Sequence, residues 1–67
     1  MMDICINGEQ RQVPDAMTVA ELLKHLELTG RRVAVEVNED IVPRSEHPEH
    51  RLDPGDRVEI VHAIGGG

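Results

Sequence analysis

Apolar and polar positions alternate at the start of the chain. Ile4 and Ile6 are separated and flanked by polar or small residues, a period of two that predicts a half-buried strand. The Asn-Gly pair at 7–8 follows, and it favours a type I′ hairpin turn because both central residues of that turn need positive φ. We therefore predict a hairpin whose return strand, about residues 9–13, is mostly polar, as at a sheet edge, and is ended by Pro14.

Residues 17–30 show a helical pattern instead. Thr18 and Glu21 fit a capping box, in which each side chain accepts a hydrogen bond from the other residue's backbone N–H. Gly30 stands where a helix C terminus favours a left-handed residue. Spacings of i, i+3, i+4 and i+7 predict one helix with a single apolar stripe, made of Val19, Leu22, Leu23 and Leu26.

The second half of the chain returns to a period of two. The valines of 33–37 share one face of a predicted third strand. A turn at 38–40 then leads to a short fourth strand at 41–42. The polar, proline-bearing stretch 44–52 is predicted to be a loop anchored by Leu52.

A last strand follows the turn-forming sequence Asp-Pro-Gly-Asp at 53–56. This strand is predicted over about residues 57–63. Its alternation points two apolar residues inward and two outward, namely Val58 and Ile60 inward and Val61 and Ala63 outward.

One helical stripe over one face of a sheet is an α+β design. We predict a β-grasp, or ubiquitin-like, arrangement, which is a mixed four- to five-stranded sheet with one main helix packed on one face. In this arrangement the last strand lies centrally beside the first. Residues 1–64 form the domain and residues 65–67 form a flexible Gly-Gly-Gly tail. The predicted core consists of Ile4, Ile6, Val19, Leu22, Leu23, Leu26, Val33, Val35, Val58 and Ile60.

The composition narrows the classes of function. The chain of 67 residues contains no Phe, Tyr or Trp, so Val, Ile and Leu must fill one small core. A net charge of -6 argues against nucleic acid, because phosphates are neutralised by a basic face. The start of the chain carries neither a signal segment nor a long apolar run, so we expect a cytoplasmic protein.

Few residues are candidates for catalysis or metal binding. A loop cluster of His47, Glu49 and His50 is interrupted by a proline that breaks any helical spacing, so no metal site is predicted. Cys5 is expected on the outer face of the first strand with no base or cation beside it. A phosphate-binding glycine loop and a nucleophile elbow are both missing from the sequence. We therefore expect a protein that is not an enzyme and that binds no cofactor.

Three glycines directly follow the predicted last strand. Glycine weakens regular structure, so stability does not explain the run. A glycine thread can enter a narrow active site, and an activated acyl group on glycine cannot racemise because its Cα is achiral. We predict that the carboxylate of Gly67 is activated by another enzyme and that residues 65–67 are mobile in the free protein. The predicted partner-binding residues are Val61, Ala63, Ile64, Gly65 and Gly66.

Three stretches of the chain together resemble one family. They are "ICINGE" at 4–9, "VAVEVNEDIVPRSEH" at 33–47 and "LDPGDRVEIVHAIGGG" at 52–67. With the size and the predicted fold, they resemble the ThiS family, the sulfur carrier proteins of thiamin biosynthesis. The Val-Pro-Arg-Ser sequence at 42–45 is the most specific part, since several ubiquitin-like carriers share the Gly-Gly ending. Many members carry an aromatic residue a few positions after this arginine, where His47 stands here.

The resemblance implies a cycle run by partner enzymes. A ThiF-like adenylyltransferase would use ATP to convert the carboxylate of Gly67 into an acyl adenylate. Sulfur from cysteine, mobilised by a cysteine desulfurase, would then replace AMP and leave a thiocarboxylate. A ThiG-like thiazole synthase would accept that sulfur while it builds the thiazole ring. The chain would thus be a protein co-substrate, and ATP would be used by the activating partner.

Other classes of protein share parts of this pattern. The small subunit of molybdopterin synthase has the same fold and tail chemistry, but those chains tend to be longer and lack the Val-Pro-Arg-Ser sequence. A ubiquitin-like modifier shares the terminal activation but ends as an isopeptide on lysine. A plain interaction module, in which the glycine end has no role, is the remaining alternative.

Overall fold

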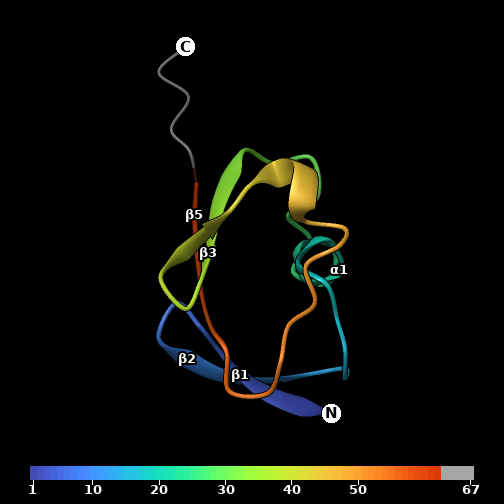
Figure 1. Ribbon diagram of the computed structural model, residues 1–67, viewed down its shortest axis with the longest axis vertical. Helices are drawn as coiled ribbons and strands as arrows, with labels where there is room; N and C mark the ends of the chain where they lie inside the picture. The colour runs from blue at the N-terminus through green and yellow to red at the C-terminus, as the bar shows by residue number, and fades with distance from the viewer. Residues whose placement is uncertain (63–67) are drawn as a thin grey trace.

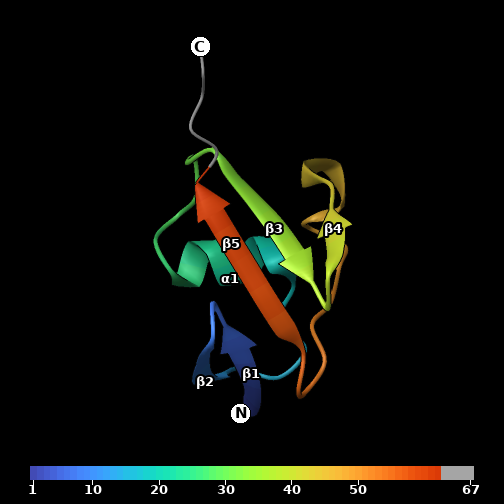
Figure 2. The ribbon, with the colours of Figure 1, turned by 90° about the vertical axis from the view of Figure 1, so that its left-hand side faces the viewer.

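Five strands and one α-helix form two layers in the computed structural model, which describes residues 1–62 (Figure 1). The strands form one sheet in the order β2-β1-β5-β3-β4, in which β1 and β5 are parallel and the other neighbours antiparallel. Helix α1 lies behind this sheet (Figure 2), so the predicted mixed sheet with one helix on one face is confirmed. In chain order the elements are β1 (Met2–Ile6), β2 (Glu9–Val13), α1 (Val19–His25), β3 (Val33–Val37), β4 (Asp40–Val42), the 3₁₀ helix η1 (Arg44–Glu46) and β5 (Arg57–His62).

The first hairpin forms as the sequence predicts. Asn7 and Gly8 have φ angles of 51° and 84°, the positive values that a type I′ turn needs. The mostly polar strand β2 lies at the edge of the sheet, where one side of its backbone is open to solvent. Its last residue, Val13, pairs with Met2 and is buried, so β2 contributes to the core only at its end.

The start of α1 is a complete capping box. The backbone N–H of Glu21 donates to the Thr18 hydroxyl (3.1 Å), and the N–H of Thr18 donates to the Glu21 carboxylate (2.8 Å). The hydrogen bond from the Thr18 backbone is the main cause that holds the pKa of Glu21 below its usual value. This cap confirms the predicted helix start.

The end of α1 differs from the prediction. The helix stops at His25, and the left-handed residue that follows it is Glu27 (φ 61°) rather than Gly30. Gly30 does have a positive φ of 85°, but it lies in the turn that leads to β3. The expectation that Gly30 ends the helix is therefore wrong.

A Schellman motif explains this early ending. The N–H of Glu27 donates to the carbonyl of Lys24 (3.0 Å), and the N–H of Leu28 donates to the carbonyl of Leu23 (2.7 Å). The motif turns Leu28 back against the core, where its side chain is partly buried. Burial of this leucine offsets the cost of placing a residue with a Cβ in the left-handed region.

Glu27→Gly is expected to stabilise the protein by about 0.5–1 kcal/mol, because glycine adopts the left-handed conformation without a Cβ clash. Lys24→Gly, in the last turn of the same helix, is the matched control and should destabilise by about 1 kcal/mol. Urea denaturation of both variants measures these changes. A loss of stability in Glu27→Gly would contradict the strain argument.

The core lies between the sheet and α1. Each core residue exposes less than a tenth of its surface. The core residues come from every helix and strand except η1, and two of them lie in connecting segments. They are Met2, Ile4, Ile6, Val13, Met17, Val19, Leu22, Leu23, Val35, Val37, Val42, Leu52, Val58 and Ile60.

Eight of the ten predicted core residues are confirmed as buried. The other two, Leu26 and Val33, are only partly buried, because each stands at the end of its element and packs on the rim of the cluster. The predicted loop anchor Leu52 is confirmed, with 1% of its surface exposed. The predicted core set lacks six residues that are buried, namely Met2, Val13, Met17, Val37, Val42 and Leu52.

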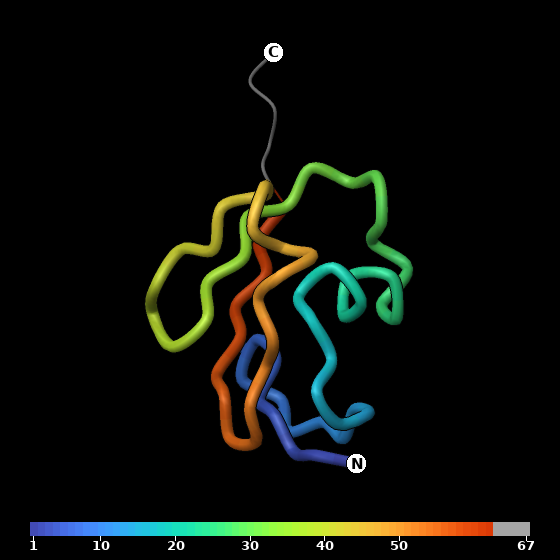
Figure 3. The backbone as a smooth tube through the Cα atoms, turned by 45° about the vertical axis from the view of Figure 1, so that its right-hand side comes forward, coloured from blue at the N-terminus to red at the C-terminus, as the bar shows by residue number. Residues whose placement is uncertain are grey.

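The segment from η1 to β5 passes beside the start of α1 (Figure 3). The N–H groups of Val19 and Ala20 donate to the carbonyls of His50 (2.9 Å) and His47 (3.0 Å). These donors lie in the first turn of α1, where no partner exists within the helix. The predicted polar loop therefore contains a 3₁₀ turn and forms part of the cap of the helix.

Candidate functional site

Strand β5 leads to the predicted functional tail, and its outer face carries the first predicted partner-binding residue. Val61 is 57% exposed and lies opposite Ala34 of β3, so its predicted outward orientation is confirmed. Two register pairs further along, on the same face, Glu59 lies opposite Glu36, and Ile41 of β4 lies opposite Glu36 on its other side. The outer face near the end of β5 thus combines exposed apolar residues with two facing carboxylates.

The remaining predicted site residues lie outside the described part of the chain. They are Ala63, Ile64, Gly65, Gly66 and Gly67, together with the expectation that residues 65–67 are mobile.

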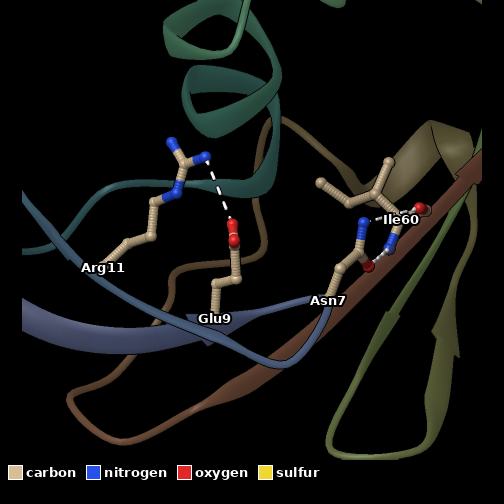
Figure 4. A network of polar contacts seen from close by, with 4 residues as sticks. All are labelled: Asn7, Glu9, Arg11 and Ile60. Carbon is tan, nitrogen blue, oxygen red and sulfur yellow. Dashed lines mark hydrogen bonds and ion pairs between the residues drawn. The ribbon is translucent and has the colours of Figure 1, made fainter.

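The second half of β5 is held on one side by a side chain instead of a strand. Strand β1 pairs with β5 only at Cys5–Arg57 and Ile6–Val58. Beyond this point the Asn7 amide Nδ2 donates to the carbonyl of Ile60 (3.1 Å), and the N–H of Ile60 donates to Asn7 Oδ1 (2.8 Å) (Figure 4). Asn7 therefore extends the ladder by one residue pair.

A second turn asparagine holds the start of β5. The Asn38 side chain accepts a hydrogen bond from the N–H of Arg57 (2.9 Å) and donates to the Asp56 carboxylate (3.0 Å). The backbone N–H of Asn38 donates to the carbonyl of Arg57 (2.7 Å). Sequence reasoning identified both asparagines only as turn residues, since their side-chain partners lie 18 to 53 positions away along the chain.

The histidine cluster does not form a metal site within residues 1–62, where no group of three potential ligands converges. His47 is buried instead, and its Nε2 lies 3.1 Å from the carbonyl oxygen of Val42. His50 is half-buried and Glu49 is exposed. His47 therefore has a structural role, because it packs η1 against the end of β4.

Cys5 is partly buried on the outer face of β1, as its parity predicts. Its strand neighbour on β5 is Arg57, whose guanidinium lies 4.0 Å from Glu39. No helix in the described range has the length and apolar character needed to cross a membrane.

A central last strand, a single helix across one face and an exposed apolar patch at the strand's end define a ubiquitin-like β-grasp domain. The chain belongs to the ThiS family, whose model matches residues 4–67. It is 33% identical over 66 residues to the sulfur carrier protein ThiS of Escherichia coli K12, which covers 98% of this chain and 100% of that protein.

Two further comparisons concern the fold and a similar segment within a longer protein. The crystal structure of the thiamine biosynthesis protein ThiS from Geobacter metallireducens superposes with a TM-score of 0.86 at 30% identity, over 98% of this chain and 100% of that one. A thiazole synthase from Paramagnetospirillum magneticum is 47% identical over 66 residues. The match covers 98% of this chain, which spans only 20% of the length of that synthase.

Proposed function

We propose that this protein is a sulfur carrier for thiazole formation in thiamin biosynthesis. The observation that carries the proposal is the family match, because it includes the glycines at 65–67 as well as the fold. The described structure supports it, since β5 is the central strand and ends at His62, three residues before the first of those glycines. An ordered domain followed closely in sequence by a run of glycines suits a protein co-substrate whose chemistry is done by other enzymes.

The proposed reaction begins with a carboxylate, which is a poor electrophile. An oxygen of the Gly67 carboxylate attacks the α-phosphorus of ATP and releases pyrophosphate, which leaves an acyl adenylate. Hydrosulfide then attacks the acyl carbon and releases AMP, and loss of the S–H proton leaves the tail as a thiocarboxylate. Adenylation supplies the good leaving group that the free carboxylate lacks.

The partners follow from these steps. A ThiF-like adenylyltransferase binds the ATP, a cysteine desulfurase supplies the sulfur indirectly, and a ThiG-like thiazole synthase accepts it. The occurrence of a similar segment within a protein named thiazole synthase supports the last pairing. The carrier itself contributes no catalytic side chain in this proposal, and its place of action is the cytoplasm.

The intact mass of the protein, purified from its own cells, tests this proposal. A fraction heavier by one oxygen-to-sulfur exchange, located at Gly67 by fragmentation, is the expected result. A fraction joined to lysines of other proteins through Gly67 would indicate a ubiquitin-like modifier instead. Sulfur transfer to a molybdopterin precursor rather than to thiazole would indicate the molybdopterin synthase class.

We further propose that Val61, with Ala63 and Ile64, forms the surface that partner enzymes bind. Val61→Asp is expected to weaken binding to the adenylyltransferase and to thiazole synthase by about tenfold or more, because it places a charge in an apolar contact. Since Val61 is 57% exposed, the fold should remain intact. Calorimetric titration with each enzyme measures the affinity.

Gln10→Asp on the edge strand β2 is the matched control for this charge, because Gln10 is exposed and lies opposite Cys5, away from Val61. It should leave both affinities unchanged. Equal affinities for wild type and Val61→Asp would remove Val61 from the interface.

A further inference from the structure

A pocket of about 520 Å³ lies between the α1–β3 connection and η1. Its lining combines apolar residues with three arginines. The apolar part includes Leu23, Leu28 and Val33, and the basic part consists of Arg31, Arg32 and Arg44.

The charge of this pocket is opposite to that of the protein. The chain has seven basic residues against thirteen acidic ones, yet three of the seven basic residues line this pocket. Neither aspartate nor glutamate is present among the described lining residues. None of the three arginines forms an ion pair with a carboxylate of residues 1–62, whereas Arg11 and Arg57 lie 3.7 Å and 4.0 Å from glutamates.

Both walls of the pocket are fixed to the core. On one side, the backbone N–H of Arg31 donates to the carbonyl of Leu28 (3.0 Å), which is itself tied to the end of α1. On the other side, η1 starts at Arg44 and is held by buried His47, whose N–H donates to the carbonyl of Arg44 (3.2 Å). The pocket therefore presents exposed guanidinium groups on a backbone that is already ordered, which lowers the entropy cost of binding.

The pocket lies beside the end of β5. Val33 lines it and is the register partner of His62, the last described residue. In Figure 2 the α1–β3 connection stands at the same end of the sheet as the tip of the β5 arrow. An enzyme that receives the residues after His62 would have the rim of its active site next to these arginines.

We propose that this pocket binds an acidic segment at the rim of the adenylyltransferase that receives the tail. The inference rests on the proposed function and adds a second contact to it, separate from Val61. Guanidinium groups bind carboxylates through two parallel hydrogen bonds, and opposite charges at a rim accelerate and orient association.

The lining favours carboxylates on a peptide over a free phosphate. Phosphate sites commonly use backbone N–H groups at a helix N terminus, whereas this pocket borders the C-terminal end of α1 through Leu23 and Leu28. The pocket therefore lacks the backbone donors of a typical phosphate site and offers arginine side chains instead. The apolar lining residues instead suit an apolar side chain next to Asp or Glu in the same segment.

The test compares two double variants with the same change of charge. Arg31→Gln/Arg32→Gln removes two guanidinium groups of the pocket, and Arg11→Gln/Arg51→Gln removes two exposed arginines elsewhere. Affinity and association rate for a ThiF-like adenylyltransferase are measured without ATP, at low and at high salt. The pocket variant should bind about tenfold more weakly at low salt, mainly through slower association, and the difference should shrink at high salt.

Each outcome has one meaning. Equal affinities for the two double variants would overturn the proposal, and so would saturable binding of inorganic phosphate with amide shifts at 28–33 and 44–48, which would identify a small-anion site. Thermal melts check that the variants fold, and Arg44→Gln, on the opposite wall, should weaken binding independently by a smaller factor. ATP–pyrophosphate exchange with the wild-type protein tests the proposed function separately. Failure of the pocket proposal and failure of the sulfur-carrier proposal therefore give different results.

Discussion

Deletion of Gly67 is expected to abolish adenylation and thiocarboxylate formation without loss of thermal stability. One extended residue spans about 3.5 Å, so the deletion withdraws the terminal carboxylate by that distance from the α-phosphorus of ATP. A misplacement of about 1 Å can already reduce a rate by about a hundredfold. Stability should be unchanged, because glycine has no side chain that could add apolar surface to the core. ATP–pyrophosphate exchange with the adenylyltransferase measures the effect.

Two controls separate the chemistry from the length of the tail. A variant that begins at Met2 also loses one residue, but at the opposite terminus, where Met1 is exposed, and it should keep full exchange activity. Conversion of the Gly67 carboxylate to an amide keeps the length and removes the anionic oxygen that attacks ATP. Exchange activity that survives amidation would show that this carboxylate is not the reactive group, and the sulfur-carrier proposal would fail.

The second large effect concerns stability. Leu22→Ala is expected to destabilise the protein by about 2–5 kcal/mol, since Leu22 is fully buried and its truncation leaves a cavity between α1 and the sheet. A domain of this size has a total stability of about 5 kcal/mol, so the variant should keep at most about 3 kcal/mol and unfold at a much lower urea concentration than the wild type. Circular dichroism and urea denaturation measure the change.

The same helix provides graded controls for this prediction. Leu23→Ala should fall at the lower end of the range, because Leu23 keeps 8% exposure and borders the arginine-lined pocket. Lys24 is exposed, so Lys24→Ala should leave the free energy of unfolding nearly unchanged. A cost below about 0.5 kcal/mol for Leu22→Ala would place this side chain outside a tightly packed core.

Local signals in the sequence were sufficient for the five strands, for the start of the helix and for the outward position of Val61. The hairpin at Asn7-Gly8, the capping box at Thr18 and Glu21 and the outward position of Val61 all depend on residues within a few positions of one another. Their conformations are set by steric limits on φ and by hydrogen bonds inside a single turn. For this reason the order of strands and helix, and the central last strand that follows from it, could be predicted.

Other features arise only when distant segments pack together. Val13 and Met17 are isolated apolar residues with no periodic neighbours, and their burial depends on where the sheet and α1 close over them. Leu28 ends the helix early because its side chain reaches the core, which outweighs the local preference for glycine at the left-handed position.

The contacts around β5 show the same dependence on long-range structure. The Asn7 side chain reaches Ile60 across 53 positions, and the arginine-lined pocket joins Arg31 to Arg44 across a strand hairpin. A backbone turn is specified by its own few residues, whereas a shared surface is specified by the packing of the whole chain. The sequence therefore identifies the elements and the glycine tail. The folded structure adds two things, namely the side-chain contacts that hold β5 and the basic pocket that lies beside the end of this strand.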